Sequence, residues 1–186
     1  MVKRRKEASS SIGYVFLFLT VMLLVIITMY MMQVAKLMTH QHHVDDALAG
    51  SVLGSLVADD EYYFLTYETS GNPIIRFKDV DESYDIFSDC MNEAVNETVD
   101  YYYNFSLDSF ICYEVEGDSV TVTTYSGNGG RKSVTLGRVG SVRTPTGAVV
   151  RETSAYGKVR FDIRSILDGS YITKTKDIYC TLEINQ

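Results

Sequence analysis

Histidine is scarce in this chain, and its placement limits the chemistry that the protein can perform. All three histidines lie in His40-Gln41-His42-His43, so a domain formed by later residues has no imidazole. The usual Ser-His and Cys-His nucleophilic pairs therefore lack their base there. A Gly-x-Ser-x-Gly elbow and a Gly-x-x-x-x-Gly-Lys phosphate loop are also missing. The sequence predicts a non-enzymatic protein with no catalytic residues, no cofactor and no small-molecule substrate.

Charge and proline are both missing from the beginning of the chain. No charged residue occurs from Ala8 to Ala35, and no proline from Ala8 to Ala58. The core of the uncharged run, Ile12–Met32, is almost wholly apolar, and roughly 20 apolar helical residues cross the ~30 Å hydrocarbon layer. A cleaved signal peptide has a shorter apolar run of ~7–15 residues. We therefore expect an uncleaved transmembrane helix over residues 8–35. The residues expected to anchor it in lipid are Ile12, Phe16, Leu19, Leu23, Ile26 and Tyr30.

The charges that flank this run predict its orientation. Lys3-Arg4-Arg5-Lys6 precedes it, whereas Lys36 is followed by Asp45 and Asp46. The positive-inside bias places residues 1–7 in the cytoplasm as a basic leader and the chain after residue 36 outside, as a single-pass protein of the cell membrane. The leader contributes about +3 to the formal net charge of -7, which leaves about -10 for the rest. An acidic exterior argues against nucleic acid and anionic lipid head groups as its partners.

Beyond the uncharged run, apolar residues recur at intervals of three and four. This spacing predicts that the same helix continues over residues 36–61 as an amphipathic extension lying against the exported domain. Asp59-Asp60-Glu61 is expected to end it, because acids at a helix C-terminus oppose the dipole. The recurring residues are Val34, Leu37, Met38, Gln41, Val44, Leu48, Val52 and Leu56.

A stripe of small residues lies within the amphipathic extension. Gly costs a helix ~1 kcal/mol relative to Ala, so two glycines here need a structural reason. Close packing is that reason, either on a sheet of the same domain or on a neighbouring helix, and both alternatives stay open. The residues expected to pack are Ala47, Gly50, Gly54 and Ala58, with Ser51 and Ser55 beside them.

Residues 62–186 are expected to form one extracytoplasmic α+β domain, an antiparallel sheet packed on one further helix. Gly117-Asp118 joins Phe110–Val115 to Val120–Tyr125 and predicts a tight hairpin. An apolar face from Ser83 to Asp100 predicts the helix. The other expected strands are Tyr62–Tyr67, Ile74–Lys78, Val134–Leu136, Ala148–Ile163 and Ile172–Ile184.

Two groups of residues could carry a cross-link or a metal. The chain has three cysteines, of which Cys112 and Cys180 lie in strand-like runs and form the candidate disulfide; three free thiols are the alternative. His40, His43 and Asp46 recur at intervals of three on the predicted helix. They are isolated from other metal ligands, so we expect ordinary polar residues at a membrane interface and no metal site.

The order of segments resembles that of the pilin-like proteins, in particular the TadE-like minor pilins (pseudopilins) of bacterial tight-adherence systems. The resemblance rests on Lys3-Arg4-Arg5-Lys6 before the apolar run and on Val44-Asp45-Asp46-Ala47-Leu48-Ala49 in the amphipathic extension. It also rests on four segments of the tail, namely Pro145-Thr146-Gly147, Glu152-Thr153-Ser154-Ala155-Tyr156, Gly157–Ile163 and Thr175-Lys176-Asp177-Ile178-Tyr179. These pilins are similar in having a processing-site Gly and a Glu five residues into the mature helix. Here Phe18 stands five residues after Gly13, so prepilin cleavage is not implied.

The resemblance implies a membrane-anchored structural protein that takes part in pilus assembly, secretion or cell adhesion. Its implied partners are the lipid bilayer and other pilin-like subunits or the pilus assembly platform. An alternative is a membrane-tethered extracytoplasmic module that binds or adheres alone. The 14 tyrosines suit adhesion, but they also suit the exposed face of a sheet. A stalk-borne enzyme with paired carboxylates is the weakest alternative.

Overall fold

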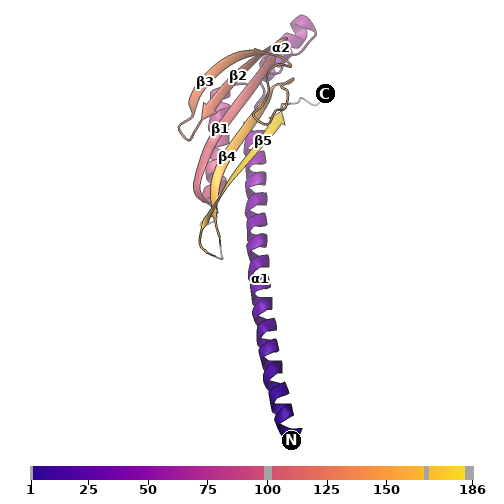
Figure 1. The fold of residues 1–186 in the computed structure, drawn as a ribbon. Helices are drawn as coiled ribbons and strands as arrows, with labels where there is room; N and C mark the ends of the chain where they lie inside the picture. Colours follow the sequence, from indigo (N-terminus) through magenta and orange to yellow (C-terminus); the bar gives the residue numbers. More distant parts are fainter. Residues whose placement is uncertain (1, 99–101, 166–167, 183–186) are drawn as a thin grey trace.

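One helix dominates the architecture. The computed structural model describes residues 2–98, 102–165 and 168–182, with side chains from Ile12 onward. Helix α1 (Val2–Ser55) extends far beyond the rest of the chain (Figure 1). Residues 56–182, which we call the head, gather around its C-terminal end and contain α2 (Asp60–Ser70), α3 (Val80–Asn96) and a five-stranded sheet. The protein is α+β, with the long helix preceding an antiparallel sheet as the sequence predicts.

The predicted continuity of the first helix is confirmed. α1 runs for 54 residues without a break, as expected where no proline removes a backbone donor. It ends at Ser55, whose hydroxyl donates to the Val52 carbonyl at 2.7 Å. The Leu56 N–H tightens this last turn by donating to the Leu53 carbonyl at 3.2 Å. The expected continuation to residue 61 is wrong, since Ala58 already pairs with Phe77 in a β-bridge.

Residues 62–67 form helix rather than the predicted strand. They belong to α2, whose N-cap Asp59 accepts the Tyr62 backbone N–H at 3.0 Å. Asp60 and Glu61 occupy the first turn, where acids favour the helix dipole. Gly71 ends α2 in the left-handed conformation, with φ of 73°. The acids that we expected to end the first helix instead begin the second.

The sheet is antiparallel throughout, in the order β3-β2-β1-β4-β5. The predicted hairpin is confirmed, because Gly117 and Asp118 link the paired residues Glu116 and Ser119. The strands are β1 (Tyr103–Glu116), β2 (Ser119–Ser126), β3 (Arg131–Arg138), β4 (Ser154–Arg164) and β5 (Tyr171–Thr181).

The other predicted elements differ in extent, and β3 and β5 differ from the expected Val134–Leu136 and Ile172–Ile184. The expected strand from Ala148 begins only at Ser154, because residues 142–150 close a turn of their own in which the Thr144 N–H donates to the Ala148 carbonyl at 2.8 Å. The short strand Ile74–Lys78 reduces to the bridge at Phe77. The predicted helix from Ser83 begins earlier, at Val80. Its expected end at Asp100 lies outside the described residues, as do Ile184 at the end of the last strand and the side chains of the leader, residues 1–7.

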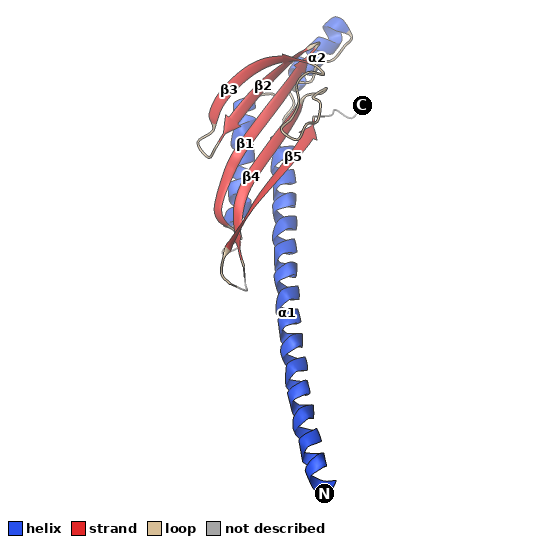
Figure 2. Cartoon of the chain, viewed as in Figure 1, coloured by secondary structure: helices blue, strands red, loops and turns tan. Residues whose placement is uncertain are grey.

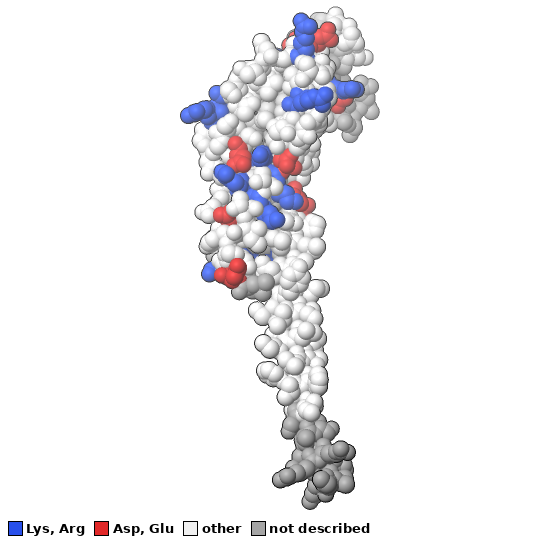
Figure 3. Space-filling model, in the orientation of Figure 1, with Lys and Arg blue, Asp and Glu red and all other residues white. Residues whose placement is uncertain are grey.

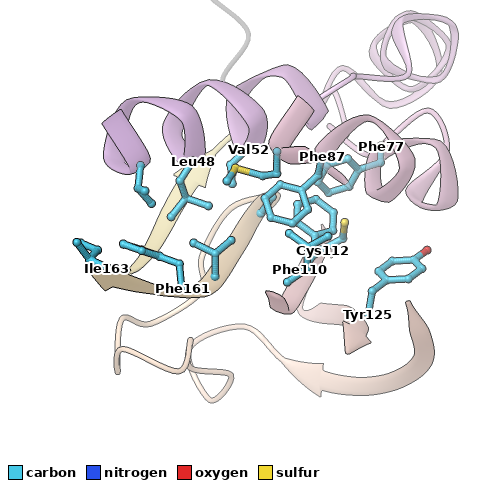
Figure 4. Close-up of a cluster of buried hydrophobic side chains, with 14 residues drawn as sticks. Leu48, Val52, Phe77, Phe87, Phe110, Cys112, Tyr125, Phe161 and Ile163 are labelled. Atoms are coloured by element: carbon cyan, nitrogen blue, oxygen red, sulfur yellow. The ribbon is translucent and has the colours of Figure 1, made fainter. Parts of the chain in front are cut away.

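α1 and α3 cover one face of the sheet (Figure 2). The main core lies between these two helices and the sheet. There Leu48 and Val52 of α1 and Phe87 of α3 meet the inward side chains of β1 and β4 (Figure 4). Phe87 stacks on Phe110 with ring centroids 4.6 Å apart. A smaller cluster, which includes Tyr113 and Tyr156, fills the opposite face. The second half of α1 is therefore part of the head's core.

Candidate membrane anchor and helix-packing surface

The first described half of α1 is an apolar shaft. We call Ile12–Met32 the shaft, and every residue in it is exposed within the monomer. The six residues expected to anchor the chain, Ile12, Phe16, Leu19, Leu23, Ile26 and Tyr30, are between 53% and 66% exposed. Figure 3 shows this part of the helix free of Lys, Arg, Asp and Glu. α1 is long and apolar enough to cross a membrane.

The two threonines of the shaft are satisfied within the helix. The Thr20 hydroxyl donates to the Phe16 carbonyl and the Thr28 hydroxyl donates to the Leu24 carbonyl, both at 2.8 Å. Such bonds matter in hydrocarbon, where an unpaired polar group costs several kcal/mol, roughly. The shaft therefore offers lipid an almost entirely apolar surface.

The environment of α1 changes at Gln33. All residues from Ile12 to Met32 are exposed, whereas Gln33, Val34, Lys36 and Leu37 are partly covered. Leu37 packs against the main core cluster. The head thus begins to shield α1 at the point where the uncharged run ends.

One stripe of the amphipathic extension is buried against the head. Val44, Leu48 and Val52 are at most 2% exposed, and they lie four residues apart on one face. Ser51 and Ser55 are also buried on this side, and the Ser51 hydroxyl donates to the Ala47 carbonyl at 2.7 Å. Most of the predicted apolar face is confirmed. Met38 is the exception, since it is 57% exposed.

The predicted packing residues do not share a surface. Ala47 lies against the core and Ala58 lies beyond the end of α1. Gly50 and Gly54 are exposed, and a Cβ atom added to either would meet nothing within 4 Å. Packing of these glycines on their own sheet is therefore wrong. They lie with Leu53, which is 57% exposed, on the outer face of α1.

The glycine that brings the helix close to the sheet is Gly157 of β4, which sequence reasoning missed. A Cβ atom there would lie 2.7 Å from Val52 Cγ2 and 3.0 Å from the Phe87 ring. A glycine inside a run of β-branched and aromatic residues is the signal that could have identified this close approach.

Two of the three histidines, His40 and His43, pack against the end of the sheet at which β1 begins, whereas His42 is exposed. His40 is 2% exposed, and its ring meets Tyr102 edge-on at 5.7 Å. The His43 Nδ1 and the Tyr102 hydroxyl are hydrogen-bonded at 2.8 Å. The Tyr102 hydroxyl also donates to the His40 carbonyl at 3.3 Å, while Asp46 is exposed. The two rings thus fasten α1 to the start of β1.

The candidate disulfide is absent from the structure. Cys112 and Cys180 are free thiols that lie on either side of Ala155, each in register with it. Strands are spaced ~4.8 Å apart, so the two cysteines are separated by ~10 Å, whereas a disulfide needs Cα atoms within ~7 Å. Burial raises the pKa of both thiols, which reduces their reactivity. Cys90, on α3, is exposed.

Comparison with known proteins adds no relative. No protein-family model, curated protein or solved structure matches this chain.

Proposed function

We propose that the protein is a non-enzymatic, single-pass membrane protein that acts as a TadE-like minor pilin or pilus assembly subunit. Residues 1–7 lie in the cytoplasm, the shaft crosses the bilayer, and the head lies outside the membrane. Other pilin-like subunits or an assembly platform contact the exposed side of α1. Anchoring and side-by-side helix packing are its two physical tasks.

The exposed side of α1 carries this proposal. The head covers only one stripe of the extension and leaves Gly50, Leu53 and Gly54 open on the same helix as the uncovered shaft. Small residues let two helix backbones approach closely, and Leu53 supplies apolar area between the glycines. The absence of histidine after residue 43 and the free outer face both suit a structural subunit rather than an enzyme.

A double substitution on the outer face tests the packing role. The variant Gly50→Leu with Gly54→Leu should insert into membranes and fold as the native chain does, because the added side chains meet open space. Cross-linking between subunits through a photoreactive residue at Leu53 should be lost. The control is Gly129→Leu, where an added Cβ atom also meets nothing within 4 Å. Unchanged cross-linking in the double variant would contradict the proposal.

Labelling of Cys90 tests the orientation. Cys90 is exposed and Cys112 is buried, so a membrane-impermeant maleimide should react mainly at Cys90. The label should appear on intact cells and disappear in Cys90→Ser. Labelling that requires broken cells would place the head in the cytoplasm and overturn the proposed topology.

A tethered binding module is the competing function, and the far end of the head favours it. α2 has no buried residues and exposes Phe64, Leu65 and Tyr67 by 56% to 61%. It lies at the end of the molecule opposite the N-terminus (Figure 1). Two results together would support this function over the first. The native protein would be monomeric in membranes, and the variant Phe64→Ser would lose adhesion.

A further inference from the structure

Three strand ends form the membrane-proximal end of the head. β1 begins at Tyr103, β4 ends at Arg164 and β5 begins at Tyr171, and we call these three residues the base. Arg164 and Tyr171 are cross-strand partners, and the rings of Tyr103 and Tyr171 meet edge-on with centroids 5.2 Å apart. Tyr171 is 54% exposed and Arg164 is exposed as well. This end of the sheet points along α1 toward the N-terminus (Figure 1).

The height of the base along α1 follows from an ion pair. Lys176 Nζ of β5 lies 2.8 Å from Asp45 Oδ2 of α1. Tyr171 precedes Lys176 by five residues, which is at most ~17 Å of strand and equals ~11 residues of helix. Tyr171 therefore lies level with α1 between Asp45 and about residue 34, with residue 34 as the limit nearest the N-terminus. The partial cover that begins at Gln33 independently gives the same limit.

This limit coincides with the edge of the apolar run. The uncharged residues end at Ala35 and the fully exposed shaft ends at Met32. If the shaft occupies the hydrocarbon, the base lies where hydrocarbon gives way to head groups. Tyrosine is enriched at this depth in membrane proteins, because its ring is apolar and its hydroxyl is polar.

Charges of both signs lie near the base. Asp162 Oδ2 accepts from the Asn104 amide at 2.7 Å, and its Oδ1 accepts from the Thr173 hydroxyl at 2.6 Å. Asp168 Oδ1 accepts from the Ser170 hydroxyl at 2.8 Å. The bonds from Thr173 and Asn104 lower the pKa of the Asp162 carboxyl. The pKa of the Asp168 carboxyl is lowered by a bond from the Ser165 side chain and by those from Ser170, so both carboxyls stay ionised. A surface with both signs of charge and exposed tyrosine suits zwitterionic phospholipid, whereas a strongly basic patch would favour anionic lipid.

We propose that the base is a lipid-contacting surface on which the head rests in the head-group layer. Tyr103 and Tyr171 enter the interface, and Arg164 reaches phosphate oxygens. The proposal rests on the membrane anchoring proposed above. It means that the bilayer holds the head at two places, through α1 and through the base beside it, which keeps the head from tilting about the shaft.

The absence of tryptophan provides a direct test, because each single Trp variant then has one fluorophore of its own. Full-length Tyr171→Trp is reconstituted in phosphatidylcholine vesicles that contain lipids brominated near the glycerol end of the acyl chain. Tyr30→Trp, in the shaft, is the control for anchoring. Tyr67→Trp, in α2 and 57% exposed, is the control for a residue far from the membrane.

The expected result is bromolipid quenching of Tyr171→Trp several-fold above that of Tyr67→Trp, with emission at shorter wavelength and weaker quenching by aqueous acrylamide. If Tyr30→Trp is quenched and Tyr171→Trp is not, the proposed lipid contact of the base is wrong, while the membrane anchoring of the shaft stands. No quenching of Tyr30→Trp would overturn the anchor and the base together. Quenching of Tyr171→Trp that needs anionic lipid and vanishes in 0.5 M salt, where the Debye length is only about 4 Å, would overturn the interfacial role of the tyrosines.

Circular dichroism identifies a variant that fails to fold, and Arg164→Trp then provides a second probe at the same level. Arg164 is exposed and pairs with Tyr171, so its replacement leaves the core untouched. Quenching of this second probe supports the proposal, and its absence in a folded protein overturns it.

Discussion

The two halves of α1 share one backbone but differ in the surroundings that their surfaces suit. In the shaft, every residue from Ile12 to Met32 is exposed and apolar residues surround the helix. In the extension, burial is confined to one side, which carries Val44, Leu48 and Val52 with His40, Ser51 and Ser55. The opposite side carries the exposed residues His42, Asp46 and Gly50. A helix that is apolar all round suits lipid, and one with a single apolar stripe suits a head in water. The same 54-residue helix therefore changes its surface character near Gln33 without a break in its backbone.

The largest effect should come from charging the shaft. Leu23→Arg with Ile26→Arg places two cations where the helix is uncharged, and each costs about 3 kcal/mol at the centre of an inserting helix. The variant should be lost from alkali-washed membranes. Leu136→Arg is the matched control, because Leu136 is 79% exposed on the edge strand β3. Retention of the double variant in the membrane fraction would contradict the claim that the shaft, unlike the extension, anchors the chain in lipid.

A pair of leucines within the extension should separate its two sides. Leu48 is 1% exposed and Leu53 is 57% exposed. Leu48→Ala should lower the free energy of unfolding by about 2–5 kcal/mol because it leaves a cavity in the core. Leu53→Ala should change it by less than about 0.5 kcal/mol. Urea unfolding of the full chain in detergent micelles, followed by near-ultraviolet circular dichroism, measures both. Equal effects would show that α1 is not packed on the head as described.

Two glycines should respond to alanine with opposite signs. Gly157→Ala forces a Cβ atom against Val52 and should cost about 1–3 kcal/mol. Gly50→Ala fills open space in an exposed helix and should add about 0.5–1 kcal/mol of stability. The same unfolding measurement compares them. Rescue of Gly157→Ala by Val52→Ala would confirm that this contact carries the cost, and a loss of stability in Gly50→Ala would contradict the open outer face.

The smallest expected effect is on the stability of the head at acidic pH. Asp81 accepts from Lys132 Nζ at 2.7 Å and from the Tyr125 hydroxyl at 2.6 Å, and these bonds lower its pKa below 3.8. Because the folded-state pKa is the lower one, the stability that Asp81 adds is present above pH 3.8 and is lost as the pH falls through the folded value. Asp81→Asn should therefore flatten the decline of Tm below about pH 4.

Lys132→Gln removes the largest cause of that shift and should flatten the same limb. The double variant should show no further flattening, since both substitutions remove one interaction. An acid limb that is unchanged in either single variant would show that this pair does not govern the head at low pH.

Much of the fold could be predicted, because apolar spacing records burial directly. The intervals of Val44, Leu48 and Val52 locate the buried stripe of α1, and the turn at Gly117-Asp118 locates the central hairpin. The outward orientation of Gly50 could also be predicted from the helical periodicity. It lies two residues after Leu48, about 200° around the helix, and so faces away from the sheet.

The wrong predictions concern features that residue composition alone does not determine. Tyr62–Tyr67 has the composition of a strand, but the Asp59 cap and the acids of the first turn specify a helix. The separation of Cys112 from Cys180 depends on β4 lying between their strands, and strand order is a tertiary property. The height of the base relative to the shaft likewise needs the contact between Lys176 and Asp45, which joins residues far apart in the chain.

The side-by-side contact between α1 and the sheet has a mechanical consequence. β4 and β5 lie alongside the helix, and the head meets α1 over several turns rather than at its tip alone (Figure 1). A pull on the distal end of the head, resisted by the shaft in the bilayer, loads the layer around Leu48, Val52 and Phe161 in shear. These contacts then share the force at once instead of separating one after another, so the joint should withstand tension better than a single linker would.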